Sequence, residues 1–202
     1  MQHGRLDIDR LLQLAAAEFA AYGFDAMSMR ALAEKCAVSQ PAIYYHFSSK
    51  EALYEEVCKR KFDDIARVVD QRVAAAAAAE QKLEAFIGAL FDEWHPDNTI
   101  LLLTQREAIN ALIDPRRCVA GSHTAHLFGL IQKILSACLG REVDQDLAFS
   151  FGSLVYGYCS LMSLDIDGSG KSPVHRVARG RAILLSHTQL ILQALAADRG
   201  AS

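Results

Sequence analysis

The side chains best suited to recognise another molecule are gathered between Ser39 and Lys50. The carboxamide of Gln40 can pair with the edge of a base, and Pro41 and Ala42 offer apolar contact to a thymine methyl group. Three adjacent side chains can reach a base or a phosphate oxygen, and a phosphate contact fixes register without reading sequence: Tyr44, Tyr45 and His46. This mixture predicts contact with double-stranded DNA.

Lys50 adds a positive charge at the predicted start of a helix. Ser48 and Glu51 have the spacing of a capping box, which indicates that a long helix begins there. A cation in the first turn opposes the helix dipole and costs about 0.3 kcal/mol or more. A phosphate at the same helix end would reverse the sign, because the lysine and the exposed N–H groups would both face an anion. We therefore expect Lys50 to contact the DNA backbone.

Three short helical patterns position these residues. Apolar residues at helical spacing predict a first helix over about residues 7–22, with Gly23 as the residue that follows it. Ser28 can cap a second helix that runs to about Cys36, and Ser39 can cap a third helix of two turns. A second and third helix joined by a short turn form a helix-turn-helix, whose second helix enters the major groove.

The rest of the chain is also predicted to be helical. The patterns indicate helices over about residues 49–73, up to Pro96, over 101–112, 116–139, 144–164 and 173–196. No strand-like alternation competes with them, so the expected fold is all-α with about nine helices. We expect a helix-turn-helix DNA-binding domain over residues 1–50 and a larger helical domain for ligand binding and dimerisation over residues 51–202.

The N-terminal region resembles the TetR family of bacterial transcriptional regulators over about residues 1–50. The residues that carry the resemblance are Gly23-Phe24, Ser28-Met29-Arg30, Leu32-Ala33, Val38-Ser39, Tyr44-Tyr45-His46-Phe47 and Ser49-Lys50-Glu51. The resemblance implies DNA-facing roles for nine residues: Arg30, Ser39, Gln40, Pro41, Ala42, Tyr44, Tyr45, His46 and Lys50. One position departs from the family, which commonly has glycine where this chain has Ala37. If that position needs a left-handed backbone, alanine there costs about 1 kcal/mol.

The long helical remainder is expected to pair two protomers, since a helix-turn-helix protein that reads a palindrome needs a two-fold partner. The segments 144–164 and 173–196 are the candidates, and the resemblance also implies pairing through the last two helices. The expected interface residues are Gly152, Ser153, Ser160, Leu184, Thr188, Ile191 and Leu195. The alternative is that both helices only close their own domain.

A ligand site is expected among the helices between about residues 66 and 139. Ligand cavities are largely apolar with a few polar anchors, which suggests Phe91, Trp94, Leu102, Arg106, Asn110, Phe128 and Tyr156 as wall residues. Each of these could instead be ordinary core or surface. Arg106 and Glu107 could anchor a polar ligand, face solvent or bridge helices.

Composition narrows the class of protein. A net charge of −3 argues against non-specific coating of nucleic acid, although three basic residues outnumber one acidic residue between Met27 and Lys50. Five scattered cysteines without a C-x-x-C pair, and an N-terminus without an apolar signal segment, predict a reduced, cytoplasmic protein. The uncharged segment 147–164 contains too many serines and glycines to favour a membrane span.

No cofactor, metal or enzyme activity is expected. His123 and His126 have helical i, i+3 spacing near Cys118, but a histidine pair on a helix surface is usually not a metal site. The segment 168–172 looks like the end of a phosphate-binding loop, but no hydrophobic strand precedes it. No serine–histidine–aspartate set or carboxylate pair suggests catalysis.

The sequence therefore predicts a homodimeric transcriptional regulator, most simply a repressor, that binds a palindromic operator and is released by an unknown small-molecule effector. One alternative is an architectural DNA-binding protein without an effector. Another is a helical small-molecule- or metal-binding protein that does not bind DNA.

Overall fold

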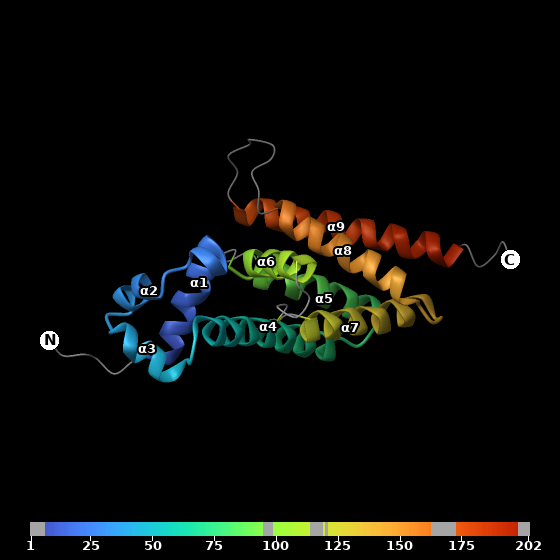
Figure 1. Cartoon of the computed structure of the whole chain (residues 1–202). Helices are drawn as coiled ribbons and strands as arrows, with labels where there is room; N and C mark the ends of the chain where they lie inside the picture. Colours follow the sequence, from blue (N-terminus) through green and yellow to red (C-terminus); the bar gives the residue numbers. More distant parts are fainter. Residues whose placement is uncertain (1–6, 95–98, 114–118, 120, 163–172, 198–202) are drawn as a thin grey trace. The chain divides into compact units, whose positions relative to one another are not determined.

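The computed structural model describes residues 7–94, 99–113, 119, 121–162 and 173–197. These residues form nine helices and no strand: α1 (Ile8–Ala26), α2 (Met29–Lys35), α3 (Gln40–His46), α4 (Lys50–Ala75), α5 (Ala79–Trp94), α6 (Thr99–Ile113), α7 (Gly121–Leu139), α8 (Gln145–Met162) and α9 (Pro173–Ala197) (Figure 1). The all-α prediction is confirmed. The predicted start of the seventh helix near residue 116 lies outside the described residues, and the described helix α7 begins at Gly121.

The chain divides into two compact units. The first comprises residues 1–63 and 99–121, and the second comprises residues 64–98 and 122–202. Thus α6 clusters with the N-terminal helices, and it packs directly on α1. The sequence predicted a single domain boundary after residue 50. In the structure the first unit also includes residues 50–63 of α4 and the whole of α6.

Serine side chains begin three of the N-terminal helices. The Oγ atoms of Ser28 and Ser39 accept hydrogen bonds from the backbone N–H of Ala31 and Ala42, both at 3.3 Å, as the sequence predicted. At α4 the prediction was one residue off. The hydroxyl that caps this helix belongs to Ser49, which accepts from the N–H of Ala52 at 3.1 Å, and not to Ser48.

The turn between α2 and α3 is a Schellman motif with alanine at its left-handed position. Ala37 has a φ of 55°, and among the described residues it is the one non-glycine residue with a positive φ. Its N–H donates to the carbonyl of Glu34, and the N–H of Val38 donates to the carbonyl of Ala33. The turn therefore has the left-handed backbone conformation that glycine usually adopts, and Ala37 is strained in that conformation.

The first unit has a continuous apolar core. Each of its helices contributes at least one side chain that is almost fully buried: Leu11, Ala15 and Phe19 from α1, Leu32 from α2, Ile43 from α3, Leu53 and Val57 from α4, and Leu103 from α6. Because α3 is only seven residues long, Ile43 is its single fully buried side chain. That anchor leaves the other sides of α3 available for contact with another molecule.

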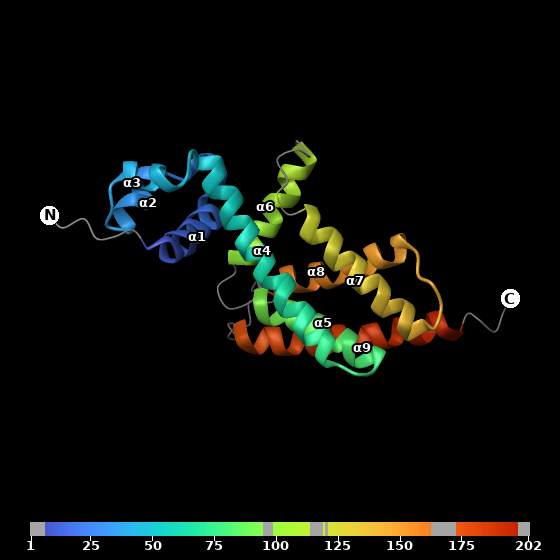
Figure 2. The same ribbon diagram turned by 90° about the horizontal axis from the view of Figure 1, so that it is seen from below.

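The second unit is built from α5, α7, α8, α9 and the end of α4. Its core includes Ile87, Phe91, Ile131, Leu135, Val155, Cys159 and Leu184. Helices α8 and α9 lie side by side (Figure 1), and α9 also packs on α5 (Figure 2). None of the described helices is both long and apolar enough to cross a membrane, α8 included. The segment 168–172, which looks like the end of a phosphate-binding loop, lies outside the described residues.

Candidate functional site

Helix α3 presents most of its side chains to solvent. Pro41 is in its first turn, where the missing N–H costs no helical hydrogen bond. Ile43 is 0% exposed, whereas Tyr45 is 86% exposed. Tyr44 and His46 are exposed as well, and Gln40 is half-buried. Exposed tyrosine and histidine side chains offer hydrogen-bonding groups to a partner molecule.

Tyr45 and His46 form a contact of their own at the end of α3. Their ring centroids are 5.2 Å apart and the rings are nearly perpendicular, at 88°. The contact holds a phenol hydroxyl and an imidazole close together on the surface, where both can bind phosphate oxygens. Phe47, the residue that follows, is half-buried and ends α3 by donating its N–H to the carbonyl of Ile43.

Arg30 and Ser39 are engaged in local contacts that still permit a DNA contact. The exposed guanidinium of Arg30 pairs with Glu34 at 3.1 Å, one turn later on α2. Such surface pairs contribute little, so exchanging Glu34 for a phosphate would cost little. Ser39 uses its oxygen as a cap acceptor, and its hydroxyl proton remains able to donate. Ala42 is half-buried on the same turn.

Lys50 is held by the end of α1. Its Nζ atom donates to the backbone carbonyl of Asp25 at 3.1 Å and lies 4.9 Å from the centre of the Phe24 ring. The carbonyl and the ring face both attract a cation, which offsets the unfavourable place of Lys50 at the start of α4. This contact was not anticipated from sequence. The phosphate contact of Lys50 stays a prediction.

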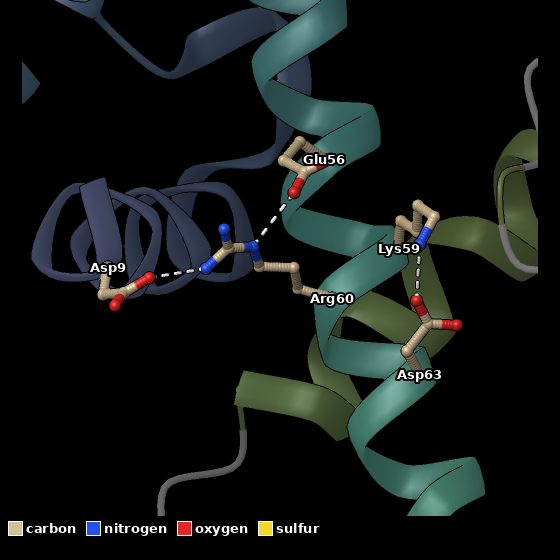
Figure 3. A network of polar contacts seen from close by, with 5 residues as sticks. All are labelled: Asp9, Glu56, Lys59, Arg60 and Asp63. Atoms are coloured by element: carbon tan, nitrogen blue, oxygen red, sulfur yellow. Dashed lines mark hydrogen bonds and ion pairs between the residues drawn. The ribbon is translucent and has the colours of Figure 1, made fainter.

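Ion pairs tie α1 to the helices beside it. Arg60 on α4 donates to Asp9 at 2.6 Å and to Glu56 at 2.9 Å, and thereby links the start of α1 to α4 (Figure 3). On the same helix Lys59 pairs with Asp63 at 2.6 Å (Figure 3). Exposed ion pairs of this kind contribute little to stability, because solvent screens them. The Arg60–Asp9 pair helps to orient α1, the helix on which α2 and α6 pack.

Arg106 on α6 caps the other end of α1. Its Nε and Nη2 atoms donate to the carbonyls of Ala20 and Ala21 at 3.0 and 3.1 Å. These carbonyls lie just before a kink at Gly23, where φ is 82° and ψ is 171°. An arginine at this end satisfies carbonyls and complements the helix dipole. Gly23 was expected to end the helix; the backbone does break there, but helical turns resume to Ala26.

Glu107, the next residue of α6, is a buried carboxylate. It is 1% exposed, and it accepts a hydrogen bond of 2.6 Å from the hydroxyl of Tyr54 on α4 and another from the N–H of Val119. The ring of Tyr54 also packs edge-on against Phe19 and Phe24 of α1. Arg106 and Glu107 were expected to anchor a ligand, face solvent or bridge helices. These contacts show that both residues bridge helices.

The expected ligand residues are divided between the two units. Phe91 and Trp94 are buried on α5, and the Trp94 ring lies 5.8 Å from that of Tyr156 on α8, at 89°. Phe128 is packed against Gly152, where it would be 2.4 Å from an added Cβ atom. Leu102, which is exposed, and Arg106 belong to the first unit. The side chain of Asn110 lies outside the described residues.

The expected dimer residues occupy different sides of α8 and α9. Leu184 and Thr188 are buried within the second unit itself, with the Thr188 hydroxyl donating to the carbonyl of Leu184. Ser153 and Ile191 are exposed, Ser160 and Leu195 are half-buried, and Gly152 is covered by Phe128. Sequence reasoning missed four exposed apolar side chains on these two helices: Phe149, Leu161, Ile183 and Leu190. The sequence shows the helical spacing of these residues, but it does not show which side of each helix packs into its own unit.

The two histidines of α7 have different partners. His126 Nε2 lies 3.0 and 3.1 Å from the two carboxylate oxygens of Asp70, and His123 contacts Ser122. Cys118, the third residue of the pattern, lies outside the described residues. Among the residues that the structure describes, no three histidine, cysteine, aspartate or glutamate side chains come together as a metal site.

The helix-turn-helix region matches a known protein family. Residues 11–57 fit the sequence model described as bacterial regulatory proteins of the tetR family. The matched segment contains α2, α3 and the first turns of α4, which carry most of the exposed residues described above.

Two relatives extend the similarity beyond this segment. The HTH-type transcriptional activator FasR of Mycolicibacterium smegmatis is 36% identical over 83 residues, which are 41% of this chain and 38% of that protein. The HTH-type transcriptional repressor KstR2 of Rhodococcus jostii is 24% identical over 146 residues, 70% of this chain and 72% of that protein. The chain thus spans well under half of FasR and most of KstR2.

The fold is shared with solved structures. The transcriptional regulator FadR from Bacillus subtilis in complex with stearoyl-CoA superposes with a TM-score of 0.69 at 16% identity, over 89% of this chain and 98% of that chain. At this level of identity the likeness establishes the all-helical fold alone.

Proposed function

The chain belongs to the TetR family of bacterial transcriptional regulators, and we propose that it acts as a homodimeric repressor that a small-molecule effector releases from a palindromic operator. The observation that carries the proposal is the exposure of α3: its one buried anchor is Ile43, while Tyr44, Tyr45 and His46 face solvent. In a helix-turn-helix, this is the helix that enters the major groove.

The nine DNA-facing residues divide by task in this proposal. Gln40, with Pro41 and Ala42 beside it, reads base edges from the N-terminal turn of α3. The remaining polar residues hold the phosphate backbone and set the register: Arg30, Ser39, Tyr44, Tyr45, His46 and Lys50. Since few of these are charged, the expected dependence of affinity on salt is moderate.

Dimerisation is proposed through the outer sides of α8 and α9. Five exposed apolar side chains lie on these adjacent helices: Phe149, Leu161, Ile183, Leu190 and Ile191. Large exposed apolar side chains on neighbouring helices favour a protein–protein contact. Light scattering on the full chain should give the mass of a dimer, and Leu190→Glu should shift it toward the monomer. A monomeric wild-type chain would contradict this part.

Effector release is proposed as a shift between two states of the dimer. A small molecule that binds the DNA-incompetent state more tightly lowers operator affinity by its differential affinity for the two states. The B. subtilis FadR structure contains stearoyl-CoA, which makes a long-chain acyl-CoA the first effector to test here. Repression is favoured over activation because the relative matched over the larger share of this chain, KstR2, is named a repressor.

Selection of bound DNA from a random pool tests the proposal. We expect a palindromic site whose half-sites are separated by about one helical turn or a multiple of it. Tyr45→Ala should then weaken binding to all sequences, whereas Gln40→Ala should relax the preference at one base pair. An unchanged preferred sequence in Gln40→Ala would assign base reading to another residue. If no specific site is selected at all, DNA recognition is wrong.

The same DNA selection, repeated with added metabolites, also tests the two alternative functions. An architectural DNA-binding protein would bind DNA but would not respond to any added metabolite. A helical ligand-binding protein without a DNA function would yield no selected sequence, even at low salt where phosphate contacts are strongest.

A further inference from the structure

Helix α3 is held in the first unit at few points. Ile43 is its single fully buried side chain, and the helix on which it packs is α2. A seven-residue helix with one buried anchor can tilt about that anchor, because few apolar contacts resist the motion. The direction of α3 therefore depends on the placement of α2.

The turn between the two helices transmits that placement. The N–H groups of Ala37 and Val38 donate to the carbonyls of Glu34 and Ala33, which belong to α2. The next residue, Ser39, caps α3 with its hydroxyl oxygen. The end of α2, the turn and the first turn of α3 thus form one hydrogen-bonded piece. A shift of α2 on α1 would therefore move the N-terminal turn of α3.

An ion pair joins the last residue of α2 to α1. Lys35 Nζ donates to Glu18 Oε1 at 2.5 Å. The Glu18 side chain is 13% exposed, whereas those of Glu34 and Asp9, in exposed pairs of the same unit, are 67% and 79% exposed. Solvent screens a covered carboxylate less than an exposed one. The hydrogen bond to Glu18 also raises the pKa of Lys35, so the ammonium stays charged at neutral pH.

We propose that Glu18 and Lys35 are positioning residues for DNA recognition: their ion pair fixes the end of α2 on α1 and so sets the direction of α3. This inference rests on the proposed DNA-binding function, and it adds two residues that act through α3 rather than by touching DNA. The side chains whose placement depends on that direction are those at the start of α3: Gln40, Pro41 and Ala42. A pair within one helix, such as Lys59–Asp63, joins no two helices and has no such effect.

The charge of DNA gives a test in which the two explanations have opposite signs. Glu18→Met removes a negative charge from the DNA-binding unit, so charge alone would tighten binding to a polyanion. Positioning predicts the reverse, with operator affinity reduced about tenfold because base contacts lose their geometry. Affinity for a non-specific duplex should stay at the wild-type value, since phosphate contacts tolerate a small tilt. Unchanged or tighter operator binding by Glu18→Met would overturn the inference.

Fluorescence anisotropy of the full chain, with the selected operator and with a scrambled duplex, measures both affinities. The temperature is kept well below each variant's Tm, so that loss of folded protein does not enter. Glu55→Met removes the same charge from an exposed position of α4 and is the matched control. It should bind the operator as tightly as wild type or slightly more tightly.

A cycle of variants assigns the effect to the pair. Lys35→Met should weaken operator binding as much as Glu18→Met and keep the wild-type salt slope. The double variant should be no weaker than either single one, because each change breaks the same contact. Lys35→Arg keeps a cation that can reach Glu18, and it should bind like wild type. Additive losses, or a lower salt slope and weaker non-specific binding in Lys35→Met, would contradict positioning and make Lys35 a phosphate contact.

Hydrogen exchange tests the same idea without DNA. Glu18→Met should speed amide exchange several-fold over residues 37–47 and leave the core of α4 protected, whereas Glu55→Met should change neither. Equal acceleration throughout the first unit would indicate general destabilisation and would overturn the inference, as would unchanged exchange over residues 37–47. Since no DNA is used, the result stands apart from the proposed function, whose failure would appear as a wild-type chain that selects no operator.

Discussion

The guanidinium of Arg106 lies against Gly23, so closely that a Cβ atom added at Gly23 would be 2.7 Å from Arg106 Nη1. The same guanidinium donates to the carbonyls of Ala20 and Ala21, which precede Arg106 by 86 and 85 residues in the chain. Because Gly23 has no side chain, the guanidinium of Arg106 can approach closely enough to cap the carbonyls of Ala20 and Ala21. Because α1 packs against α2 and α6, this cap helps to set the frame on which the helix-turn-helix stands.

Gly23→Ala should destabilise the first unit. A φ of 82° with ψ of 171° is a region that almost only glycine adopts, and a side chain there costs about 1–3 kcal/mol before the clash with Arg106 is counted. Thermal unfolding followed by circular dichroism should show a decrease of several degrees in Tm. Gly129→Ala is the matched control, since an added Cβ there meets nothing within 4 Å, and it should be neutral or stabilising. Equal Tm values for wild type and Gly23→Ala would contradict the cap.

Tyr54 should make stability fall steeply at high pH. Burial raises the pKa of Tyr54, and Cys58 and Glu107 beside it act in the same direction. Since the folded pKa lies above the unfolded value of about 10, the contribution of the neutral phenol is complete below that pH and is lost as pH rises above it. Melting temperatures of wild type and Tyr54→Phe, measured from neutral pH upward, should therefore converge above about pH 10.

At neutral pH, Tyr54→Phe should be less stable than wild type, because one oxygen of the buried Glu107 loses the donor 2.6 Å away. The expected cost is about 1–3 kcal/mol. Tyr22→Phe, at an exposed side chain, is the control for the pH series. A constant difference between wild type and Tyr54→Phe at every pH would mean that titration of Tyr54 is not linked to folding.

Ala37→Gly should stabilise the protein. The residue adopts φ 55° in the Schellman turn, and glycine has no Cβ penalty there, so the expected gain is about 1 kcal/mol. Ala31→Gly, within α2, is the opposite control and should cost a similar amount through helix propensity. Urea unfolding measures both. If Ala37→Gly behaves like Ala31→Gly, the left-handed turn is not strained.

Local signals in the sequence predicted most of the first unit. Ser28 and Ser39 cap their helices because a hydroxyl reaches an N–H only three residues away, a relation that spacing alone reveals. Ser48 and Ser49 are adjacent hydroxyls with equal claim to the cap of α4, so the pattern could not decide between them. The same ambiguity affects α9, where periodicity marks an apolar stripe but does not tell whether it packs on its own unit or on another chain.

Long-range contacts were beyond the sequence. Arg106 and Glu107 stood out as charged residues in an apolar helix, yet their partners lie on α1 and α4, and no spacing rule joins residues so far apart in the chain. The indole N–H of Trp94 is buried without a hydrogen-bond partner, and no pattern in the sequence predicts this. Whether a buried donor has a partner depends on the packing of several helices, so only the folded structure can reveal it.

Lys50 allows a test that separates a structural role from DNA contact. Its ammonium donates to the carbonyl of Asp25 and lies over the ring of Phe24, so loss of the charge should cost some stability whatever its role on DNA. If it also binds a phosphate, Lys50→Met should weaken operator binding for every sequence and reduce the slope of log affinity against log salt by about 1. Fluorescence anisotropy of a labelled operator across a salt series measures that slope. Lys59→Met, at an exposed lysine of the same helix that pairs with Asp63, should keep the wild-type slope. A Lys50→Met protein that is less stable but has the wild-type salt slope would assign this lysine to the α1–α4 junction alone.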